Sequence, residues 1–305
     1  MVSPETKITW NKIKDPFLSD RGIQLILQRE DLIDPEISGN KWRKLKYNIS
    51  AFQAGNYDRI LTFGGAYSNH IAATAAAGRI NNIPTVGLIR GEVTHPLNPT
   101  LNKAQKDGMT LKFITRTDYK LKNTPDFLQA LEIQFPNSFI IPEGADNDLG
   151  MQGCQEILTH SPDFDLVTLT VGTGNTFLGM IQRLKEKQRA LGFPVIKEAI
   201  RLEKQLEEKA QYQYGSEPHP EWSFENEAHF GGYGKYSKQV HEFINNFFRQ
   251  HSIPLDPIYT GKMMLRLYEM IEEGTLKDQT ILAIHTGGLQ GIKGYEQRYR
   301  IQLFD

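Results

Sequence analysis

The sequence predicts an α/β protein with a mostly parallel sheet. Short apolar runs of strand length recur along the chain, and segments with a helical pattern, such as the alanine-rich residues 70–80, separate them. Several of these apolar runs also end in a polar turn that contains glycine, as in Gly64-Gly65. Repeated strand–helix alternation is typical of parallel sheets that carry helices on both faces.

The apolar runs are rich in Val, Ile, Leu and Thr and are too short for helices, so we assign them to strands. In chain order, strands are expected over 24–27, 59–63, 85–89, 110–114, 138–141, 166–171 and 280–284. Helices are expected over 70–80 and over the charged segment 178–192. The most polar stretch, 205–228, is expected to be a surface excursion between helices. One group of strands lies within 59–141, and this spacing permits two sheets, two domains and a cleft between them.

The composition excludes several classes of protein. The 305 residues carry a formal net charge of −1, with a pI of about 6.7, so the overall field favours neither nucleic acid nor an anionic membrane. No window reaches the roughly 18 apolar residues of a membrane span, and the N-terminus lacks the pattern of a signal peptide. The one cysteine, Cys154, cannot form an internal disulfide and is expected to be buried. A cytoplasmic protein without a metal site is expected.

The first glycine-bearing turn runs from Gly64 to His70 and leads into the helix that begins near residue 71. Ser or Asn at a helix start is often only an N-cap. Alternatively, backbone N–H groups and the side chains of Ser68, Asn69 and His70 hold a carboxylate, because ligands of open α/β sheets bind at the carboxyl ends of strands. The residues alone leave both interpretations open.

A second turn, residues 172–176 (Gly-Thr-Gly-Asn-Thr), follows a buried-strand pattern and precedes a helix. Two glycines let the backbone approach an anion, so this turn is expected to cradle a phosphate. It is not a P-loop, and Gly179 comes two positions too late for a dinucleotide fingerprint, which disfavours a nucleotide-binding oxidoreductase. A third turn, residues 285–288, ends the last strand, and a histidine at such a strand end is more often structural than catalytic.

A fourth segment, residues 38–45 (Ser-Gly-Asn-Lys-Trp-Arg-Lys-Leu), has a different character. Lysines in such a run are normally solvated, but Lys41 follows a Gly-Asn turn, where a lysine can point at a ligand. Schiff-base chemistry needs a lysine whose pKa is depressed by burial or by a cationic neighbour. Arg43 and Lys44 are candidates for that field, and Lys44 is also within reach of a phosphate. Lys262 is the rival lysine, and spacing alone does not choose between it and Lys41.

Taken together, these segments resemble the D-cysteine desulfhydrase and 1-aminocyclopropane-1-carboxylate (ACC) deaminase family of pyridoxal 5′-phosphate (PLP) enzymes. The order and spacing of the motifs carry the resemblance over nearly the whole chain. It implies that PLP forms a Schiff base with Lys41 and that residues 172–176 hold its phosphate. The cofactor-binding residues expected in this way are Lys41, Lys44, Asn69, Gly172, Thr173, Gly174, Asn175, Thr176 and Thr260.

The same resemblance implies the catalytic and substrate-binding roles. Ser68-Asn69-His70 is similar to the family's catalytic turn, in which the Asn meets the ring oxygen of the cofactor and the Ser lies near the substrate. In the segment 256–262, Tyr259 would reach the substrate and Thr260 would face the pyridine nitrogen. Tyr233 falls where the family has a second active-site tyrosine. The implied catalytic residues are Lys41, Ser68, Tyr233 and Tyr259, and the implied substrate-binding residues are Ser68, Asn69, His70, Tyr259 and Thr286.

The family also implies an architecture. Its members have fold type II, the tryptophan synthase β-like arrangement of two open, twisted, mostly parallel sheets with helices on both faces. A larger cofactor-binding domain, residues 1–44 and 155–305, would close on a smaller mobile domain, residues 45–154, with PLP between them. Members are usually homodimers. Tyr67 departs from the family pattern, because many members have Gln at that position.

Two threonines help to predict the substrate. Members that open the cyclopropane ring have Glu beside the pyridine nitrogen and Leu in the His-x-Gly-Gly motif, whereas this chain has Thr260 and Thr286. A carboxylate at the ring nitrogen stabilises the pyridinium and strengthens the electron sink, which a hydroxyl cannot do. Loss of a thiolate needs less carbanion stabilisation than ring opening. We therefore expect β-elimination from a small D-amino acid such as D-cysteine, giving pyruvate, ammonia and sulfide.

Other functions stay open at this point. ACC deamination is the main alternative within the family. A PLP-binding protein with little catalysis would show the yellow cofactor colour without a spectral response to amino acids. A β-replacement enzyme of the cysteine synthase type, a racemase and a dehydratase share the same fold.

Overall fold

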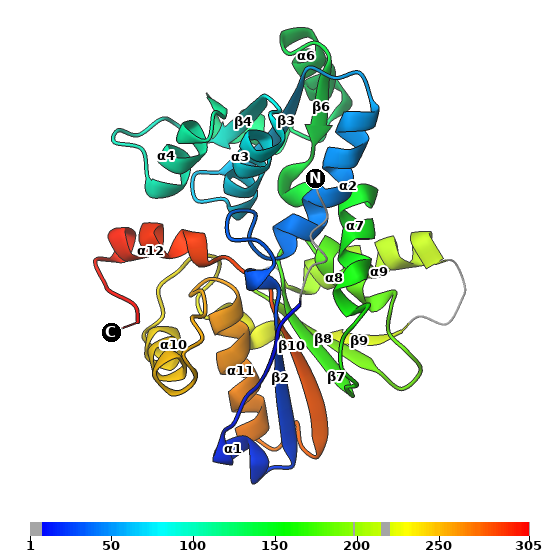
Figure 1. Ribbon diagram of the computed structural model, residues 1–305, viewed down its shortest axis with the longest axis vertical. Coiled ribbons are helices and arrows are strands. Elements are labelled where there is room, and N and C mark those ends of the chain that lie inside the picture. Colours follow the sequence, from blue (N-terminus) through cyan, green and yellow to red (C-terminus); the bar gives the residue numbers. More distant parts are fainter. Residues whose placement is uncertain (1–7, 198, 215–219, 305) are drawn as a thin grey trace.

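Two separate β-sheets form the framework of the protein (Figure 1), and the computed structural model describes residues 8–197, 199–214 and 220–304. The larger sheet has the order β1 (Trp10–Lys12), β2 (Ile23–Arg29), β10 (Gln279–His285), β7 (Leu166–Val171), β8 (Arg189–Pro194) and β9 (Glu221–Phe224). The smaller sheet has the order β5 (Thr110–Ile114), β4 (Thr85–Arg90), β3 (Arg59–Gly65) and β6 (Ser138–Ile141). Paired strands run parallel except β1 and β2. The expected α/β fold is confirmed.

Helices surround both sheets. Those that belong to the first half of the chain are α1 (Pro16–Ser19), α2 (Asn40–Ala54), α3 (Asn69–Asn81), α4 (Pro99–Lys106), α5 (Arg116–Lys120), α6 (Pro125–Gln134) and α7 (Asp148–Cys154). The others are α8 (Asn175–Ile181), α9 (Ala199–Tyr214), α10 (Lys238–His251), α11 (Thr260–Glu272) and α12 (Ile292–Tyr299). Short 3₁₀ turns are η1 (Glu30–Leu32), η2 (Glu143–Ala145), η3 (Gln155–Leu158), η4 (Asn226–His229) and η5 (Leu289–Gly291).

Every strand expected from the sequence is present, and three strands, β1, β8 and β9, were not expected. The expected helix over 178–192 is wrong. Helix α8 ends at Ile181, Lys187 adopts a left-handed backbone with φ of 71°, and β8 begins at Arg189. The reason is non-local, because β8 pairs in parallel with β7 along its whole length, which outweighs the weak β propensity of its glycine and proline.

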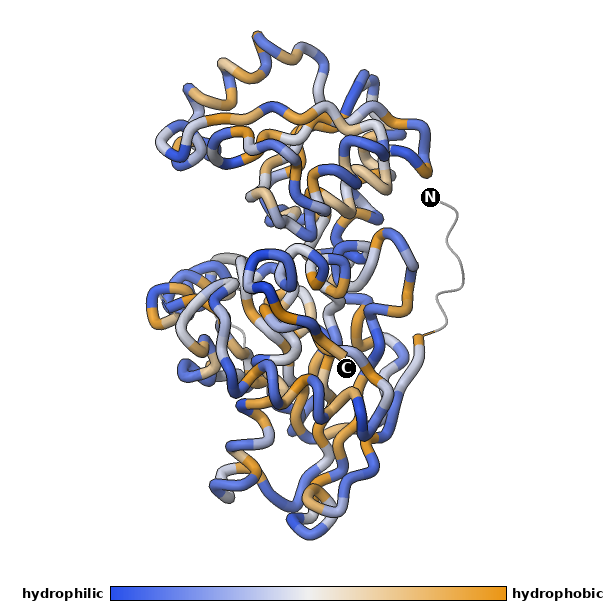
Figure 2. Tube along the Cα trace, turned by 90° about the vertical axis from the view of Figure 1, so that its left-hand side faces the viewer, coloured by the Kyte–Doolittle hydropathy of each residue, from blue (hydrophilic) through white to orange (hydrophobic). Residues whose placement is uncertain are grey.

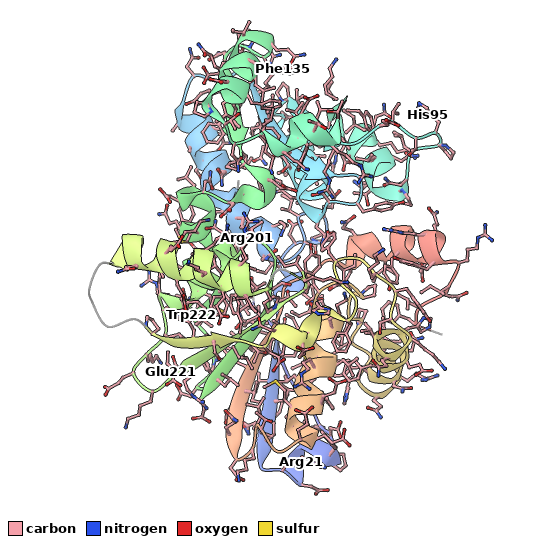
Figure 3. All side chains as sticks on the ribbon, turned by 180° about the vertical axis from the view of Figure 1, so that it is seen from behind. Arg21, His95, Phe135, Arg201, Glu221 and Trp222 are labelled. Atoms are coloured by element: carbon pink, nitrogen blue, oxygen red, sulfur yellow. The ribbon has the colours of Figure 1, made fainter. Side chains whose placement is uncertain are left out.

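The expectation that 205–228 is a surface excursion is also wrong for most of that stretch. Its first part continues α9, where Leu202, Leu206 and Ala210 recur at every fourth residue and bury one face of the helix. Its last part forms β9, which extends the sheet beyond β8. Figure 3 shows α9, marked by Arg201, lying across the strand marked by Glu221 and Trp222. Residues 215–219 lie outside the described part of the chain.

The core is divided between the faces of the two sheets. In β3, Ile60 packs under α2 and α3, whereas Leu61 packs under α5 and α6, as the alternation of side chains along a strand requires. In the larger sheet, one face packs against α10 and α11 and the other against α7, α8 and α9. Figure 2 shows two parts of the chain, one above the other, each with hydrophobic segments in its interior.

All strands of the smaller sheet come from within 59–141. The proposed boundaries of a smaller, mobile domain at 45 and 154 stay a prediction, and Met151 and Cys154 of α7 pack in the core of the larger sheet. What matters for function is the direction of the strands. The carboxyl ends of β3, β4, β7 and β10 lead to residues that line one cavity between the two sheets.

Candidate active site

A cavity of about 780 Å³ lies between the two sheets. It is bordered by the start of α2, the turns after β3, β7 and β10, and one side of α12. The residues expected at the site that line it are Lys41, Lys44, Ser68, Asn69, His70, Gly172, Thr173, Gly174, Thr176, Tyr233, Tyr259 and Thr286. Asn175 and Thr260 are buried and directly follow lining residues in the sequence, but neither is among the residues that line the cavity.

Lys41 stands at the first turn of α2. Its Nζ donates to Oδ1 of Asn40 at 2.9 Å, and the Asn40 amide in turn donates to Oγ1 of Thr176 at 3.0 Å. Burial, and next the charge of Lys44, lower the pKa of Lys41 to about 7. A large fraction of Lys41 is therefore a free amine at neutral pH, the form that can attack a carbonyl.

The turn that delivers Lys41 requires a glycine. Gly39 has φ of +68°, and a Cβ at this position would lie 1.9 Å from the carbonyl oxygen of Thr286. The backbone N–H of Asn40 donates to that same oxygen at 3.1 Å. The start of α2 is thus held against the turn after β10, so Lys41 is fixed relative to Thr286.

The two cations beside Lys41 have different roles. Arg43 is buried and paired with Glu30 at 3.0 Å and with Glu156 at 3.3 Å, so it does not supply the cationic field that the sequence suggested. Lys44 does, because it is the charged neighbour that lowers the pKa of Lys41. Lys44 Nζ donates to the carbonyl of Gly144 at 2.9 Å, and burial lowers its own pKa.

Lys262, the other candidate lysine, forms its hydrogen bonds outside the cavity. Lys262 is fully buried outside the cavity lining, and its Nζ donates to the carbonyls of His229 at 2.7 Å and Gly232 at 2.8 Å. Its side chain therefore holds the loop that carries Tyr233. Of the two candidate lysines, the structure brings only Lys41 to the cavity.

The turn after β3 serves two purposes at once. The Ser68 hydroxyl accepts from the N–H of Ile71 at 3.3 Å and caps α3, which is the structural interpretation left open by the sequence. The backbone N–H groups of Asn69 and His70 occupy the first turn of α3, where a helix offers donors without intrahelical partners. Gln290 donates its side-chain amide to Oδ1 of Asn69 and so connects this turn to η5.

His70 is neutral, and its tautomer can be deduced. The Thr62 hydroxyl donates its hydrogen to the carbonyl of Ile141 at 2.8 Å, so it accepts from Nε2–H of His70, 2.8 Å away. Nδ1 of His70 is buried, carries no hydrogen and has no partner among the described residues. Burial and the charges of Lys41 and Lys44 hold the pKa of His70 well below its usual value. The ring thus offers an acceptor, and only the backbone N–H of His70 can donate to a carboxylate.

The glycine turn after β7 is shaped by packing as well as by its suitability for an anion. Gly174 has φ of +88°, and a Cβ there would lie 2.3 Å from Leu206 of α9. The Asn175 side chain points away from the cavity and donates to the carbonyls of Ala145 and Asn147, each at 3.0 Å. Asn175 could therefore contact a ligand only through its backbone. Residues 172–174 and Thr176 form the part of the turn that faces the cavity.

Asp256 organises the start of α11. Its buried carboxylate accepts from the N–H groups of Ile258 at 2.9 Å, Tyr259 at 2.7 Å and Thr260 at 2.9 Å. Thr260 Oγ1 is buried and has no hydrogen-bond partner among the described residues. A buried hydroxyl without a partner is costly, and this one stands beside Tyr259, which lines the cavity.

The turn after β10 presents Thr286 to the cavity, with its Oγ1 3.4 Å from Oγ1 of Thr170. His285, just before it, is structural. Its Nδ1 accepts from the N–H of Gly287 at 3.2 Å, so Nε2 donates to the carbonyl of Pro254 at 2.8 Å. The expectation that this histidine is structural agrees with these contacts.

Residues 12–287 match the family model described as pyridoxal-phosphate dependent enzyme. The chain belongs to this family. Its members use PLP, so this protein is a PLP-dependent enzyme, and the cofactor expected from the motifs is confirmed.

The names of individual relatives agree with this family assignment. A Pyrococcus abyssi protein, provisionally named a 1-aminocyclopropane-1-carboxylate deaminase, is 27% identical, with 90% of this chain and 87% of the relative covered. The bifunctional D-cysteine desulfhydrase/ACC deaminase of Arabidopsis thaliana is 27% identical, with 89% and 74% covered. A crystal structure of an ACC deaminase homologue superposes with a TM-score of 0.78 at 26% identity, covering 92% and 90% of the two chains. The relationship expected from the motifs is confirmed.

The residues of this PLP-dependent enzyme suit its cofactor. Lys41 provides a primary amine with a lowered pKa, which a carbonyl group requires. The turn 172–176 provides backbone donors for a phosphate at the carboxyl end of β7. The buried hydroxyl of Thr260, which has no partner among the described residues, is a hydrogen-bonding group that would suit a ring nitrogen. Among the described residues, no helix is long and apolar enough to cross a membrane.

Several residues at the cavity were not expected from the sequence. They are Asn40, Arg90, Arg116, Glu143 and Arg298 in the lining, and Gln290 behind Asn69. For Asn40 and Gln290 a signal existed, because Asn40 belongs to the segment 38–45 and Gln290 lies two residues after the turn 285–288. For the arginines none existed, because each lies at the end of a different element and only the folded chain brings them to one cavity.

Proposed function

We propose that this PLP-dependent enzyme is a lyase that catalyses β-elimination from a small D-amino acid, with D-cysteine giving pyruvate, ammonia and sulfide. The observation that carries the proposal is the buried, unpartnered hydroxyl of Thr260 beside the cavity. The family resemblance assigns this position to the partner of the pyridine nitrogen. The names of the relatives support elimination and deamination as the class of reaction.

The chemistry of Thr260 favours a good leaving group. PLP, when bound, acts as an electron sink for the charge left on Cα after proton removal. A carboxylate at the ring nitrogen would keep that nitrogen protonated, whereas a threonine hydroxyl does not. Expulsion of a thiolate from Cβ requires less stabilisation of the negative charge on Cα than opening a cyclopropane ring does. The threonine therefore suits D-cysteine better than ACC.

The substrate carboxylate has a ready site in the turn after β3. The N–H groups of Asn69 and His70 have no acceptor within the described chain, and the Ser68 hydroxyl lies beside them. His70 contributes no ring donor, because its Nε2–H is directed at Thr62. We assign carboxylate binding to these two N–H groups and the Ser68 hydroxyl.

We infer two proton transfers. Lys41 Nζ, as a free amine, removes the proton from Cα, since its pKa of about 7 makes it a competent base at neutral pH. The Tyr259 hydroxyl, which donates to Tyr233 in the free site, then turns to the substrate and donates its proton to the departing sulfur. Burial and the adjacent Tyr233 raise the pKa of Tyr259 well above its usual value, so its hydroxyl stays protonated.

The resemblance further supports a homodimer, and the single cysteine supports a reducing, cytoplasmic location. Within the family, ACC deamination is the second candidate, because relatives carry that name.

The experiment offers D-cysteine, L-cysteine and ACC in parallel to the purified PLP-loaded enzyme, with sulfide and keto acid as readouts. We expect sulfide and pyruvate from D-cysteine, little from L-cysteine, and no 2-oxobutyrate from ACC. Product from ACC but none from D-cysteine would overturn the assignment from Thr260 and Thr286. The Lys41→Ala variant should lose turnover altogether, and residual turnover at the wild-type rate would exclude Lys41 as the catalytic lysine.

A further inference from the structure

Three arginines border the cavity without carboxylate partners. Arg90 ends β4, Arg116 begins α5 and Arg298 lies in α12, and all three line the cavity that contains Lys41. None of them forms an ion pair with a carboxylate in the described part of the chain. Glu143, the one acidic side chain among the described lining residues, already pairs with Lys122 at 3.3 Å.

One of these arginines, Arg90, stands beside the turn that we assign to the substrate carboxylate. Arg90 is the register partner of Gly65, the last residue of β3, and a Cβ built on Gly65 would lie 3.5 Å from Nη2 of Arg90. A Cβ built on Gly91 would lie 4.0 Å from Nε of Arg116. The Arg90 guanidinium therefore lies beside the end of β3, and Arg116 lies beside the residue that follows Arg90.

Arg298 lies in α12, and α12 packs on the same turn. Gly294 of α12 packs on Tyr67, since a Cβ there would lie 2.8 Å from the Tyr67 ring. Arg298 is four residues further along α12 and so lies on the same face of the helix. Arg90 and Arg298 thus lie near the turn of residues 65–70, and Arg116 lies next to the segment that carries Arg90. The glycine turn of residues 172–176, expected to hold the cofactor phosphate, belongs to the larger sheet instead.

We propose that this pocket selects an amino acid whose side chain ends in a second anionic group, a carboxylate bound by Arg90, Arg116 and Arg298. The proposal rests on the proposed β-elimination and specifies its substrate class. The α-carboxylate already has donors in Asn69, His70 and Ser68, so the arginines are left for another anion. Guanidinium groups bind carboxylates through two parallel hydrogen bonds, which gives geometric specificity as well as attraction.

A thioether of D-cysteine with a terminal carboxylate fits this description. With S-carboxymethyl-D-cysteine, the α-proton is removed and the Cβ–S bond breaks, its electron pair leaving on sulfur, which is protonated to mercaptoacetate. The remaining enamine of three carbons takes up one water and yields pyruvate and ammonia. No oxidant, reductant or further co-reactant is needed.

The test compares S-carboxymethyl-D-cysteine with S-carbamoylmethyl-D-cysteine, its amide, which has nearly the same shape but no second charge. Stopped-flow absorbance of the bound cofactor gives an apparent Kd for each ligand whether or not elimination follows. We expect the PLP-loaded enzyme to bind the acid about tenfold or more tightly than the amide. The variants Arg90→Gln and Arg298→Gln should each bring the two Kd values close together.

Arg300→Gln is the matched control, because it removes one positive charge two residues beyond Arg298 from a side chain that does not line the cavity. It should keep the preference for the acid. Equal binding of acid and amide by the wild type would overturn the proposal. An equal loss of acid, amide and D-cysteine binding in the arginine variants would also overturn it, because it would mean that the arginines bind the α-carboxylate. A preference for the acid without pyruvate release would leave this inference standing and refute the elimination reaction instead. Sulfide release from D-cysteine without a preference for the acid would support the elimination reaction and refute this inference.

Discussion

The hydroxyl of Tyr259 donates to the hydroxyl of Tyr233 at 3.1 Å, and the two rings meet edge to face with centroids 5.9 Å apart. Tyr259 stands at the N-cap of α11, whereas Tyr233 belongs to the loop that leads to α10. The contact therefore joins two segments at the cavity wall. Tyr233 is 49% exposed and connects the more deeply placed Tyr259 with solvent.

This pair leads to a prediction about the leaving group. Tyr259→Phe should lower kcat for D-cysteine by about a hundredfold, the usual contribution of a general acid, because the departing sulfur loses its proton donor. With 3-chloro-D-alanine the loss should be much smaller, since chloride leaves without a proton. Steady-state pyruvate release from both substrates checks this. Tyr236→Phe, three residues from Tyr233 and outside the cavity lining, is the control. A similar loss with both substrates would assign Tyr259 to binding.

Lys262 provides a second prediction. In Lys262→Met the carbonyls of His229 and Gly232 lose their buried donor, so the free energy of unfolding should fall by about 2 kcal/mol or more, as measured by chemical denaturation. Catalysis should fall as well, because the loop with Tyr233 is released. Borohydride reduction should nevertheless still fix the cofactor on Lys41. A labelled peptide containing residue 262 in the wild type would contradict the assignment.

The lowered pKa of Lys41 predicts the pH dependence of cofactor capture. The amine attacks only when deprotonated, and its pKa of about 7 lies well below that of an ordinary lysine. The rate at which apoprotein binds PLP, followed by absorbance, should therefore rise with pH, reach half its maximum near pH 7 and then level off. A rate that still climbs steeply between pH 8 and 10 would show that Lys41 is not perturbed.

The turn before Lys41 predicts a steric effect. Gly39→Ala places a Cβ 1.9 Å from the Thr286 oxygen in a left-handed backbone, so α2 must shift and PLP affinity should fall at least tenfold. Gly274→Ala is the control, because Gly274 also has positive φ, +75°, but no atom within 4 Å of the added Cβ. It should cost only about 1–2 kcal/mol of stability and leave PLP affinity intact. Equal PLP affinity in both variants would mean that α2 adjusts without moving Lys41.

The sequence by itself determined the elements whose signals are local. The strands that were predicted, such as 166–171 or 280–284, are short apolar runs bounded by turn residues, and the turns themselves mark where ligands bind. The motif around Lys41 and the turn 172–176 were recognisable for the same reason. Ser68 as an N-cap followed from the residue type alone.

Only the tertiary structure decided which of these pieces meet. β10, near the end of the chain, inserts between β2 and β7, and this brings Thr286 against Gly39 and fixes Lys41 at the cavity. Lys262 is equally plausible in sequence, but folding buries its amine among carbonyls. Arg90, Arg116 and Arg298 line one cavity only because the two sheets face each other in the folded chain. The physical reason is that helix and strand signals depend on neighbours in the chain, whereas a site depends on contacts between residues that are far apart in it.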